Sequence, residues 1–518
     1  MPYIVEQKVK GKIYLYKVES YWDKDKQQAR QKRTYLGPKE KGKNAKIKQK
    51  KTNLVSKNFG NMYLLRYISN KLKITELLQS IFTEAYFEIL TLAYYEIMEG
   101  SALYLFPYWF DEQYLPKVRK LYSSAISKLC DDIGRAQTQR IEFINQWIEH
   151  LKPIKGIYFD ITSISSYSTK IDFIEWGYNR DNENLPQLNM GVVLCQNNLL
   201  PIYYSLYPGS IVDVTTLKNI IKYLEVFKIE NILCVFDKGF FSKSNILELN
   251  DHDNKIEFIQ PVPLRLTKAK ALLYNNKIQL RNNKKAFKYN EEILHHLSSS
   301  LEFDNIVFES HIFFNEKIEV DQKHNFLKTL MEIEEKAKKN KFSCFNECLK
   351  FKNENIKENF IRFFKCNRAT QEIEMNLKVI NSYIAKMGTF ILLTNRQNMD
   401  KIEVLEYYRN KDNVEKVFDI VKNEMDGDRL RVHSQYNTEG RLFIKFIALI
   451  IYMEISKVMK DKELFEKYTV KEMFSELKKL KIIQIGNNEP FLSELSKRQK
   501  IILKAFDIKE DINIFHSY

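Results

Sequence analysis

The chain has 518 residues, which is enough for about two to four domains with a substantial buried core. Hydrophobic residues make up 44% of it and aromatic residues 13%, and this composition excludes a largely disordered chain. Lys and Arg number 82 against 66 Asp and Glu, giving a formal net charge of +16. The excess favours an anionic partner, with nucleic acid as the commonest, while a merely solvated basic surface is the alternative.

Nothing in the sequence indicates export or a membrane span. The start, Met1 to Glu6, has no apolar stretch behind a basic one, so we expect no signal peptide. The most apolar segment, Phe443 to Met459, is short and carries Lys445 and Glu454, which predicts a core helix. The six cysteines are scattered and lack the tight pairs of a zinc site. We therefore expect a cytoplasmic protein with no membrane partner.

The first 152 residues divide into two predicted regions. Three short apolar runs within residues 3–36 predict a small antiparallel sheet, and the Lys-rich stretch from Lys39 to Lys51 predicts a flexible linker. Together they form a small N-terminal β region with its linker, residues 1–52. Apolar residues at three- and four-residue steps then predict helices over 57–151. Because it follows a basic linker, we interpret 53–152 as a helical DNA-binding domain, with a plain helical scaffold as the alternative.

From residue 154 the pattern changes to buried strands and helices. Residues 157–162, 190–195, 201–207, 232–237 and 256–261 read as strands, and 213–227 and 242–250 read as helices. Three closely connected strands followed by alternating helices and strands predict an α/β fold with a mixed sheet flanked by helices. Residues 153–264 are the first part of this core.

Residues 265–397 fit that order poorly and are predicted to be an inserted domain. They contain Lys-rich stretches, a helical run at about 325–377, and short strand-like pieces at 306–308 and 390–393. Helical patterning returns at 401–424 and 440–460, which predicts a second part of the core at 398–462. Residues 463–518 are expected to form a C-terminal helical tail.

Two aspartates stand in or at the end of apolar strands. Asp160 follows Tyr158 and Phe159, and Asp237 ends the strand that begins at Ile232. A carboxylate in such a strand is costly unless it is paired or binds a metal. Two of them on neighbouring strands would form a hard oxygen site suited to Mg²⁺ or Mn²⁺. The alternative is that each aspartate caps the turn that follows its strand.

A third carboxylate is expected from a helix beside these strands. Tyr408, Lys411, Glu415 and Lys422 are spaced three, four and seven residues apart, which predicts that they share one face of one helix. Val414, Phe418 and Val421 fall on an adjacent face and can pack against the sheet. The alternative is an ordinary amphipathic helix whose charged residues face water.

Read in order, the polar motifs resemble those of the DDE transposases of bacterial insertion sequences, in the group whose third motif is Tyr, Arg, Glu and Lys on one helix. The resemblance covers about residues 150–460, and the family's arginine is Lys411 here. The stretches that carry it are Asp160-Ile161-Thr162-Ser163, Gly177-Tyr178-Asn179-Arg180-Asp181, Leu185-Pro186-Gln187, Pro208-Gly209-Ser210, Asp237-Lys238-Gly239-Phe240, Tyr408 to Lys422, and Thr438 to Ile444.

This resemblance implies an RNase H-like core that performs cut-and-paste DNA transposition. It implies that Asp160, Asp237 and Glu415 are catalytic and hold two Mg²⁺ or Mn²⁺ ions, with Asp160 bridging them. The residues expected to contact DNA phosphates are Tyr408, Lys411, Lys422 and Arg180.

The implied partners are double-stranded DNA, as terminal inverted repeats and as target, and a second copy of the chain on DNA. The implied location is the bacterial cytoplasm, at the nucleoid. Two alternatives remain open: an inactive DNA-binding protein derived from a transposase, and a stand-alone RNase H-like nuclease.

Overall fold

The computed structural model describes residues 2–24, 26–39, 54–115, 118–168, 170–180, 183–211, 213–227, 229, 232–250, 256–425, 427, 429–430, 432 and 434–509. Most of the predicted basic linker, and Asp181 of the stretch Gly177 to Asp181, lie outside the described residues. The chain divides into two compact units, Met1–Lys57 with Lys481–Glu494 and Asn58–Leu480 with Leu495–Tyr518.

The smaller unit contains two small sheets. In the first, β1 (Tyr3–Val9), β2 (Lys12–Asp23) and β3 (Gln28–Pro38) are antiparallel neighbours and include the three apolar runs noted in the sequence. Lys10 and Gly11 join β1 to β2 with φ angles of 49° and 78°, the conformation that a tight hairpin turn requires. The second sheet has the order β18-β17-β4, from β4 (Leu54–Asn58), β17 (Lys481–Ile485) and β18 (Phe491–Leu492).

The larger unit begins with a group of helices. On the first helix, apolar residues that recur at three- and four-residue steps, such as Leu64, Leu65 and Ile68, are buried. The helices are α1 (Gly60–Lys71), α2 (Ile74–Ile81), α3 (Tyr86–Met98), α4 (Phe106–Glu112), α5 (Ser123–Arg135) and α6 (Gln137–Leu151).

A mixed sheet flanked by helices follows, as the sequence predicts. Its first elements are β5 (Gly156–Ser166), β6 (Gln187–Cys195), β7 (Pro201–Pro208), α7 (Asp213–Val226), β8 (Leu233–Val235), α8 (Lys243–Asn250) and β9 (Glu257–Pro261). Strands β5, β8 and β9 run parallel, whereas β6 and β7 are antiparallel additions beside β5. Every residue of β6 is buried, as expected for a strand covered on both faces.

The sheet extends further than the sequence indicated. Beside β9 it continues through β15 (Thr389–Thr394), β12 (Ile306–Phe314), β11 (Glu292–Phe303) and β10 (Ala286–Tyr289), all antiparallel. With β16 (Arg429–Leu430) on the end of β5, the sheet has ten strands within the described residues. Much of the region set apart as an insertion therefore belongs to the central sheet.

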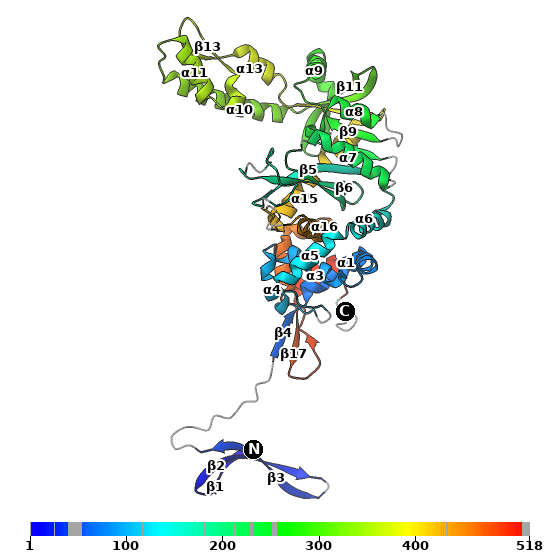
Figure 1. The fold of residues 1–518 in the computed structure, drawn as a ribbon, viewed down its shortest axis with the longest axis vertical. Coiled ribbons are helices and arrows are strands. Elements are labelled where there is room, and N and C mark those ends of the chain that lie inside the picture. Colours follow the sequence, from blue (N-terminus) through cyan, green and yellow to red (C-terminus); the bar gives the residue numbers. More distant parts are fainter. Residues whose placement is uncertain are drawn as a thin grey trace. The chain divides into compact units, whose positions relative to one another are not determined.

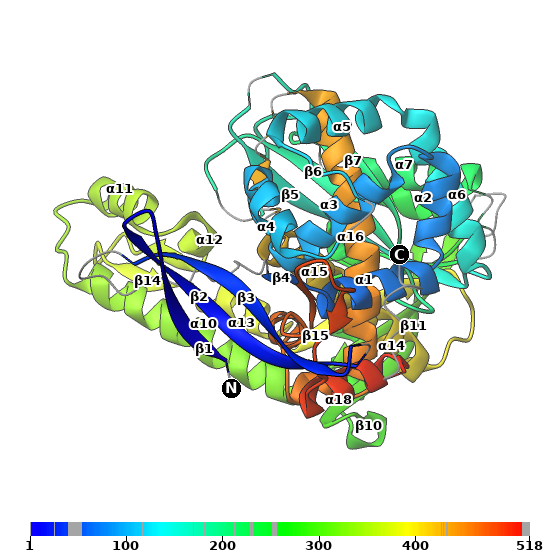
Figure 2. The same ribbon diagram turned by 90° about the horizontal axis from the view of Figure 1, so that it is seen from below.

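Residues Glu316–Ile384 form a lobe with a hydrophobic core of its own, which includes Leu330, Cys348 and Phe363. The lobe stands to one side of the sheet in Figures 1 and 2. A helical run at about 325–377 was expected, but a β-hairpin interrupts it. The elements are α10 (Glu316–Lys338), α11 (Phe345–Asn355), α12 (Glu358–Ile361), β13 (Phe364–Cys366), β14 (Ile373–Met375) and α13 (Leu377–Ile384), and α9 (Thr267–Leu280) precedes β10.

The apolar segment near residue 450 is the central helix α16 (Gln435–Asp461). It contacts α3, α5 and β7, and Figure 1 shows it between the sheet and the N-terminal helices. Two charged residues within the apolar stretch are paired: Lys445 with Glu96 at 2.6 Å and Glu454 with Lys71 at 2.9 Å. Among the described residues, no helix is long and apolar enough to cross a membrane. Helices α17 (Val470–Leu477) and α18 (Lys497–Ala505) follow.

The pair Glu96 and Lys445 is a test of this packing, because both side chains are buried. Glu96→Ala removes the carboxylate that balances the charge of the buried Lys445 ammonium, which should lower the free energy of unfolding by about 3–5 kcal/mol. Lys71→Ala breaks the more exposed pair and should cost less than about 1 kcal/mol. Denaturant unfolding of both variants measures the difference, and equal losses would contradict the structure.

Candidate active site

Asp160 and Asp237 lie on adjacent parallel strands. In β5 every residue except Asp160 is buried, and the side chain of Asp160 retains 16% exposure. Tyr158 of β5 is paired with Val235 of β8, and Asp237 follows Val235 by two residues. The shared register therefore brings both carboxylates to the same end of the sheet.

The third carboxylate comes from a helix that is broken at Lys411. Helix α14 (Lys401–Asn410) ends before it and α15 (Asp412–Asp419) begins after it. Around the break, the Lys411 N–H donates to Tyr408 O at 3.2 Å, and the Val414 N–H donates to Lys411 O at 2.8 Å. These three-residue bonds tighten the chain. Helix α15 packs against β5 and places Glu415 above the two aspartates.

The expectation of one continuous helix face is therefore wrong. A π-helical turn, Ile420–Glu424, follows α15, and its N–H groups bond five residues back, as Met425 does to Ile420 at 3.1 Å. The predicted face is therefore interrupted at Lys411, and Lys422 lies in the π-helical turn beyond α15.

The three carboxylates meet at the Lys411 ammonium. Its Nζ atom lies 3.8 Å from Asp160 Oδ2, 3.4 Å from Asp237 Oδ1 and 3.7 Å from Glu415 Oε1. Because each oxygen lies within 3.8 Å of the same Nζ atom, no two of these oxygens are separated by more than twice that distance. Lys411 is 3% exposed, whereas Asp237 and Glu415 are 43% and 65% exposed. One buried cation therefore offsets part of the negative charge of three acids, two of which are well exposed to solvent.

The pKa values in this cluster follow from burial and from charge. Burial raises the pKa of Asp160 to about 6, and Asp237 adds to the rise, while Lys411 and the N–H of Ile161 oppose it. Burial alone would lower the pKa of Lys411, but Asp237, Asp160 and Glu415 together raise it above its ordinary value. Lys411 is therefore a stable cation, and the cluster is held together by its charge.

The other predicted phosphate-binding residues lie around this cluster at different depths. Tyr408 stacks on Phe390, with ring centroids 6.0 Å apart, and burial and Asp237 raise its pKa. Arg180 is half-buried, and its Nη1 donates to Ser163 Oγ on β5 at 3.4 Å. Lys422 is half-buried in the π-helical turn. Lys411 faces the carboxylates, and its phosphate contact stays a prediction.

Arg409 does not replace the missing arginine of the third motif. It pairs with Glu292 at 2.6 Å and lies over the ring of Tyr289, both towards β10 and β11.

The glycines and amide side chains of the stretches between Gly177 and Ser210 are explained by the packing of the loops that contain them. A Cβ atom on Gly177 would meet Gly209 O at 1.9 Å, and one on Gly209 would meet Gln187 O at 2.1 Å, so both positions require glycine. The buried Asn179 donates to Ser165 Oγ of β5 at 3.0 Å, and Gln187 donates to Tyr178 O at 2.8 Å. These contacts fix the loop that carries Arg180 beside Asp160.

A pocket that the sequence analysis missed begins at Asp237. Its volume is about 710 Å³, and Asp237 is the one acidic residue of its lining. The cations that line it, which we call the basic pocket residues, are Lys238, Arg265, Lys270, Arg362 and Lys386. Only Lys238 belongs to a motif; the others come from separate elements, and their spacing in the sequence carries no signal.

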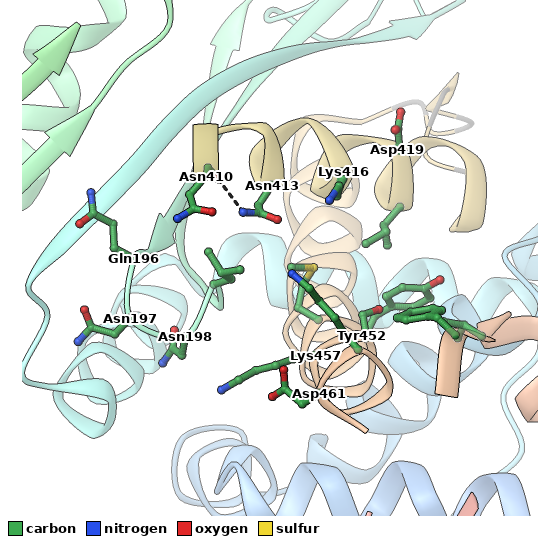
Figure 3. A pocket seen from close by; sticks show the side chains of 17 residues that line it. Gln196, Asn197, Asn198, Asn410, Asn413, Lys416, Asp419, Tyr452, Lys457 and Asp461 are labelled. Atoms are coloured by element: carbon green, nitrogen blue, oxygen red, sulfur yellow. Dashed lines mark hydrogen bonds between the residues drawn. The ribbon is translucent and has the colours of Figure 1, made fainter. Parts of the chain in front are cut away.

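A second cavity, of about 570 Å³, lies behind α15 (Figure 3). Asn413 and Lys416 line it from the helix, with the β6–β7 turn and the C-terminal part of α16 opposite, and Asn413 donates to Asn410 O at 2.7 Å. Its lining carries both charge signs, including Asp419 and Asp461, and none of the three clustered carboxylates belongs to it.

The donor chemistry of the cluster suits a hard divalent cation, because three carboxylates supply only oxygen ligands. Within the described part of the chain, no three His, Cys, Asp or Glu side chains are grouped closely enough to hold a metal ion as they stand. The Lys411 ammonium instead stands between the acids, in the place where a cation is needed.

The raised pKa of Asp160 makes a prediction about metal-free protein. The folded state holds this proton more tightly than the unfolded state, so the contribution of Asp160 to stability is present below about pH 4 and lost as pH rises through about 6. The stability of wild type relative to Asp160→Asn should therefore fall by up to roughly 3 kcal/mol across that range. Denaturant unfolding in chelator measures it, and a difference that is constant with pH would be inconsistent with burial of this carboxyl.

The comparisons with known proteins concern the region that contains this site. Residues 152–451, more than half of the chain, match the family model described as the transposase DDE domain. No curated protein matches the chain. A cryo-EM structure of the piggyBac transposase synaptic complex with hairpin DNA aligns at 9% identity over 86% of this chain and 70% of that chain, with a TM-score of 0.33, too low to support a shared fold. On the family match alone, the chain belongs to the transposases that carry this DDE domain.

Proposed function

We propose that the protein is the cut-and-paste transposase of a bacterial insertion sequence, which cleaves DNA at transposon ends and transfers the 3′-hydroxyl ends into target DNA. One observation carries this proposal. Asp160, Asp237 and Glu415, far apart in the sequence, converge on one point at the end of the sheet, inside the region that matches the transposase DDE domain. An RNase H-like core is the fold expected to bring such acids together.

The same three carboxylates would hold two Mg²⁺ or Mn²⁺ ions. Bound metal would activate the attacking water or 3′-hydroxyl and stabilise the leaving oxygen. Mg²⁺ ligands lie at about 2.0–2.1 Å, much closer than the oxygens now lie to Lys411. Metal binding therefore requires the Lys411 ammonium to withdraw, and until then Lys411 limits repulsion among the acids.

The remaining residues of the site would position DNA. Tyr408, with its hydroxyl near Asp237, and Arg180, anchored on Ser163 beside Asp160, flank the carboxylates and can contact the phosphates on either side of the scissile one. Lys422 is proposed as a further phosphate contact. Lys411, once withdrawn from the acids, is a single point charge and lacks the bidentate fork of the family's arginine.

End recognition is assigned to the N-terminal regions of the chain. The proposed ligands are the terminal inverted repeats, and because two ends must be joined, the active form is proposed to be a dimer on DNA. The formal charge of +16 supports binding to an anionic polymer of this kind.

The carboxylates give the first test. Asp160→Asn, Asp237→Asn and Glu415→Gln should each lower cleavage of DNA flanking the gene by at least about a hundredfold in Mg²⁺, since even indirect metal contacts contribute 10–100-fold. DNA binding without metal should persist, because the fold is kept and one negative charge is removed.

Asp419→Asn is the matched control, because it removes an exposed acid from the same helix, on the side of the second cavity. It should cleave like wild type. Full cleavage by any of the three site variants would remove that residue from the catalytic set. Binding without cleavage by the wild type would favour an inactive, transposase-derived protein, and cleavage without strand transfer would favour a nuclease.

Lys411→Met gives the second test, because Met keeps the length of the side chain and removes its charge. The metal-free variant should lose roughly 1–3 kcal/mol of stability at pH 7, less than for a fully buried pair because two of the acids face solvent. Mn²⁺ should bind it at least about tenfold more tightly than wild type, since no ammonium has to withdraw.

Lys416→Met removes an exposed lysine from the same helix and should change neither quantity. Calorimetric titration with Mn²⁺ and unfolding in chelator measure both effects. Weaker Mn²⁺ binding by Lys411→Met would show that Lys411 does not compete with the metal.

A further inference from the structure

The basic pocket lies where three parts of the larger unit meet. The turn that carries Asp237 and Lys238 closes one end, and the connection from β9 to α9 supplies Arg265 and the start of α9 supplies Lys270. The lobe and its return to β15 supply Arg362 and Lys386. The pocket therefore runs from a proposed metal ligand to the lobe.

The described part of the chain supplies one acid, Asp237, against the five cations of this pocket. Within the described residues, no ion pair joins any of the five basic pocket residues to a carboxylate, and Asp237 is engaged by Lys411. Burial lowers the pKa of Lys386, and the neighbouring Lys270 and Arg362 lower it further. Like charges held together without partners destabilise a folded chain, so their clustering indicates an anionic ligand rather than a structural role.

The lobe also restrains one of these groups, Arg362, through two aromatic rings. The Arg362 guanidinium lies over the rings of Phe363, 4.7 Å from the centroid, and Tyr383, 5.3 Å from the centroid. Phe363 belongs to the hydrophobic core of the lobe, and Tyr383 packs against it. Arg362 is thus restrained at the pocket wall while remaining exposed. A restrained guanidinium loses little freedom when it binds a phosphate.

We propose that the basic pocket binds the phosphodiester backbone of the DNA strand that leads from the scissile phosphate towards the lobe, with Lys270, Arg362 and Lys386 as its phosphate contacts. This rests on the proposed function, because the reacting phosphate must lie at Asp237, where the pocket begins. The pocket is much larger than one phosphate group, and its cations come from separate elements, so a strand with successive phosphates fits it better than a single small anion.

The test is the salt dependence of DNA binding in chelator, where no cleavage occurs. The triple variant Lys270→Gln, Arg362→Gln, Lys386→Gln of the full chain is compared with wild type on a mixed-sequence duplex, between about 50 and 200 mM salt. Each lost phosphate contact lowers the slope of log affinity against log salt by about 0.9, so the slope should fall by about 2 to 3. Its melting temperature should change little, because relief of the repulsion among the three charges offsets the lost contacts of Arg362 with the Phe363 and Tyr383 rings.

The matched control is Lys328→Gln, Lys336→Gln, Lys339→Gln, which removes three exposed lysines from the same lobe that do not line the pocket. Its slope should stay within about 0.5 of wild type. The proposal would be overturned if the salt slope fell equally in this control and in the pocket triple (Lys270→Gln, Arg362→Gln, Lys386→Gln), or if the slope of the pocket triple were unchanged. A third outcome would indicate a small-anion site instead. In that outcome, inorganic phosphate raises the melting temperature of the wild type but not of the pocket triple, and the two proteins have the same salt slope for DNA binding.

If the pocket triple is poorly folded, the single variant Lys270→Gln tests the proposal, because Lys270 is exposed and its substitution should not disturb the fold. This variant should lower the salt slope by about one. The two proposals fail in different ways. Wild type that binds DNA with the predicted slopes but does not cut in Mg²⁺ would refute the transposase activity and leave the pocket as a DNA site. Wild type that cuts while the pocket triple keeps its slope would refute only the pocket.

Discussion

The structure depends on how three like charges are tolerated at the end of a buried sheet. Asp160, Asp237 and Glu415 would repel one another in the folded chain if nothing neutralised them. The Lys411 ammonium meets all three within 3.8 Å and is almost fully buried. Its place at the break between α14 and α15 explains why the helix is divided there, since the break directs the side chain into the cluster. The acids remain partly exposed. The arrangement therefore reduces repulsion in the folded protein and leaves the site accessible to metal and DNA.

Much of the fold could be predicted from the sequence, because its signals are local. The strands around Asp160 and Asp237 are continuous apolar runs, and the helix steps before residue 151 are regular, so their type and order follow from periodicity. Pairing partners are not local. Nothing in the run near Ile391 shows that β15 pairs with β9, and strands that extend the central sheet were therefore assigned to an insertion. The β-hairpin inside the lobe was missed because the flanking sequence is strongly helical.

In the candidate site, too, the features with a local sequence signal could be predicted, and those that depend on the tertiary fold could not. The three carboxylates could be selected because a motif orders them along the chain, and the structure brings them together. The role of Lys411 could not be foreseen, because a lysine on a charged helix face is expected to reach outward for phosphate. The π-helical turn that contains Lys422 has no sequence signature. The basic pocket was missed for a different reason, since residues as distant as Lys270 and Lys386 meet only through the tertiary fold.

The site thus joins two electrostatic devices, an acidic cluster that needs a cation and a basic pocket that needs an anion, and they share Asp237. Metal ions and a DNA strand are complementary to this pair. The central claim is that Lys411 holds the place of the metal, and a crystal structure grown with Mn²⁺ tests it most directly through the anomalous scattering of manganese. The account predicts an anomalous peak among Asp160, Asp237 and Glu415, with the Lys411 ammonium moved out of the cluster. A Lys411 ammonium still centred on the three carboxylates at saturating Mn²⁺, with no peak beside them, would contradict it.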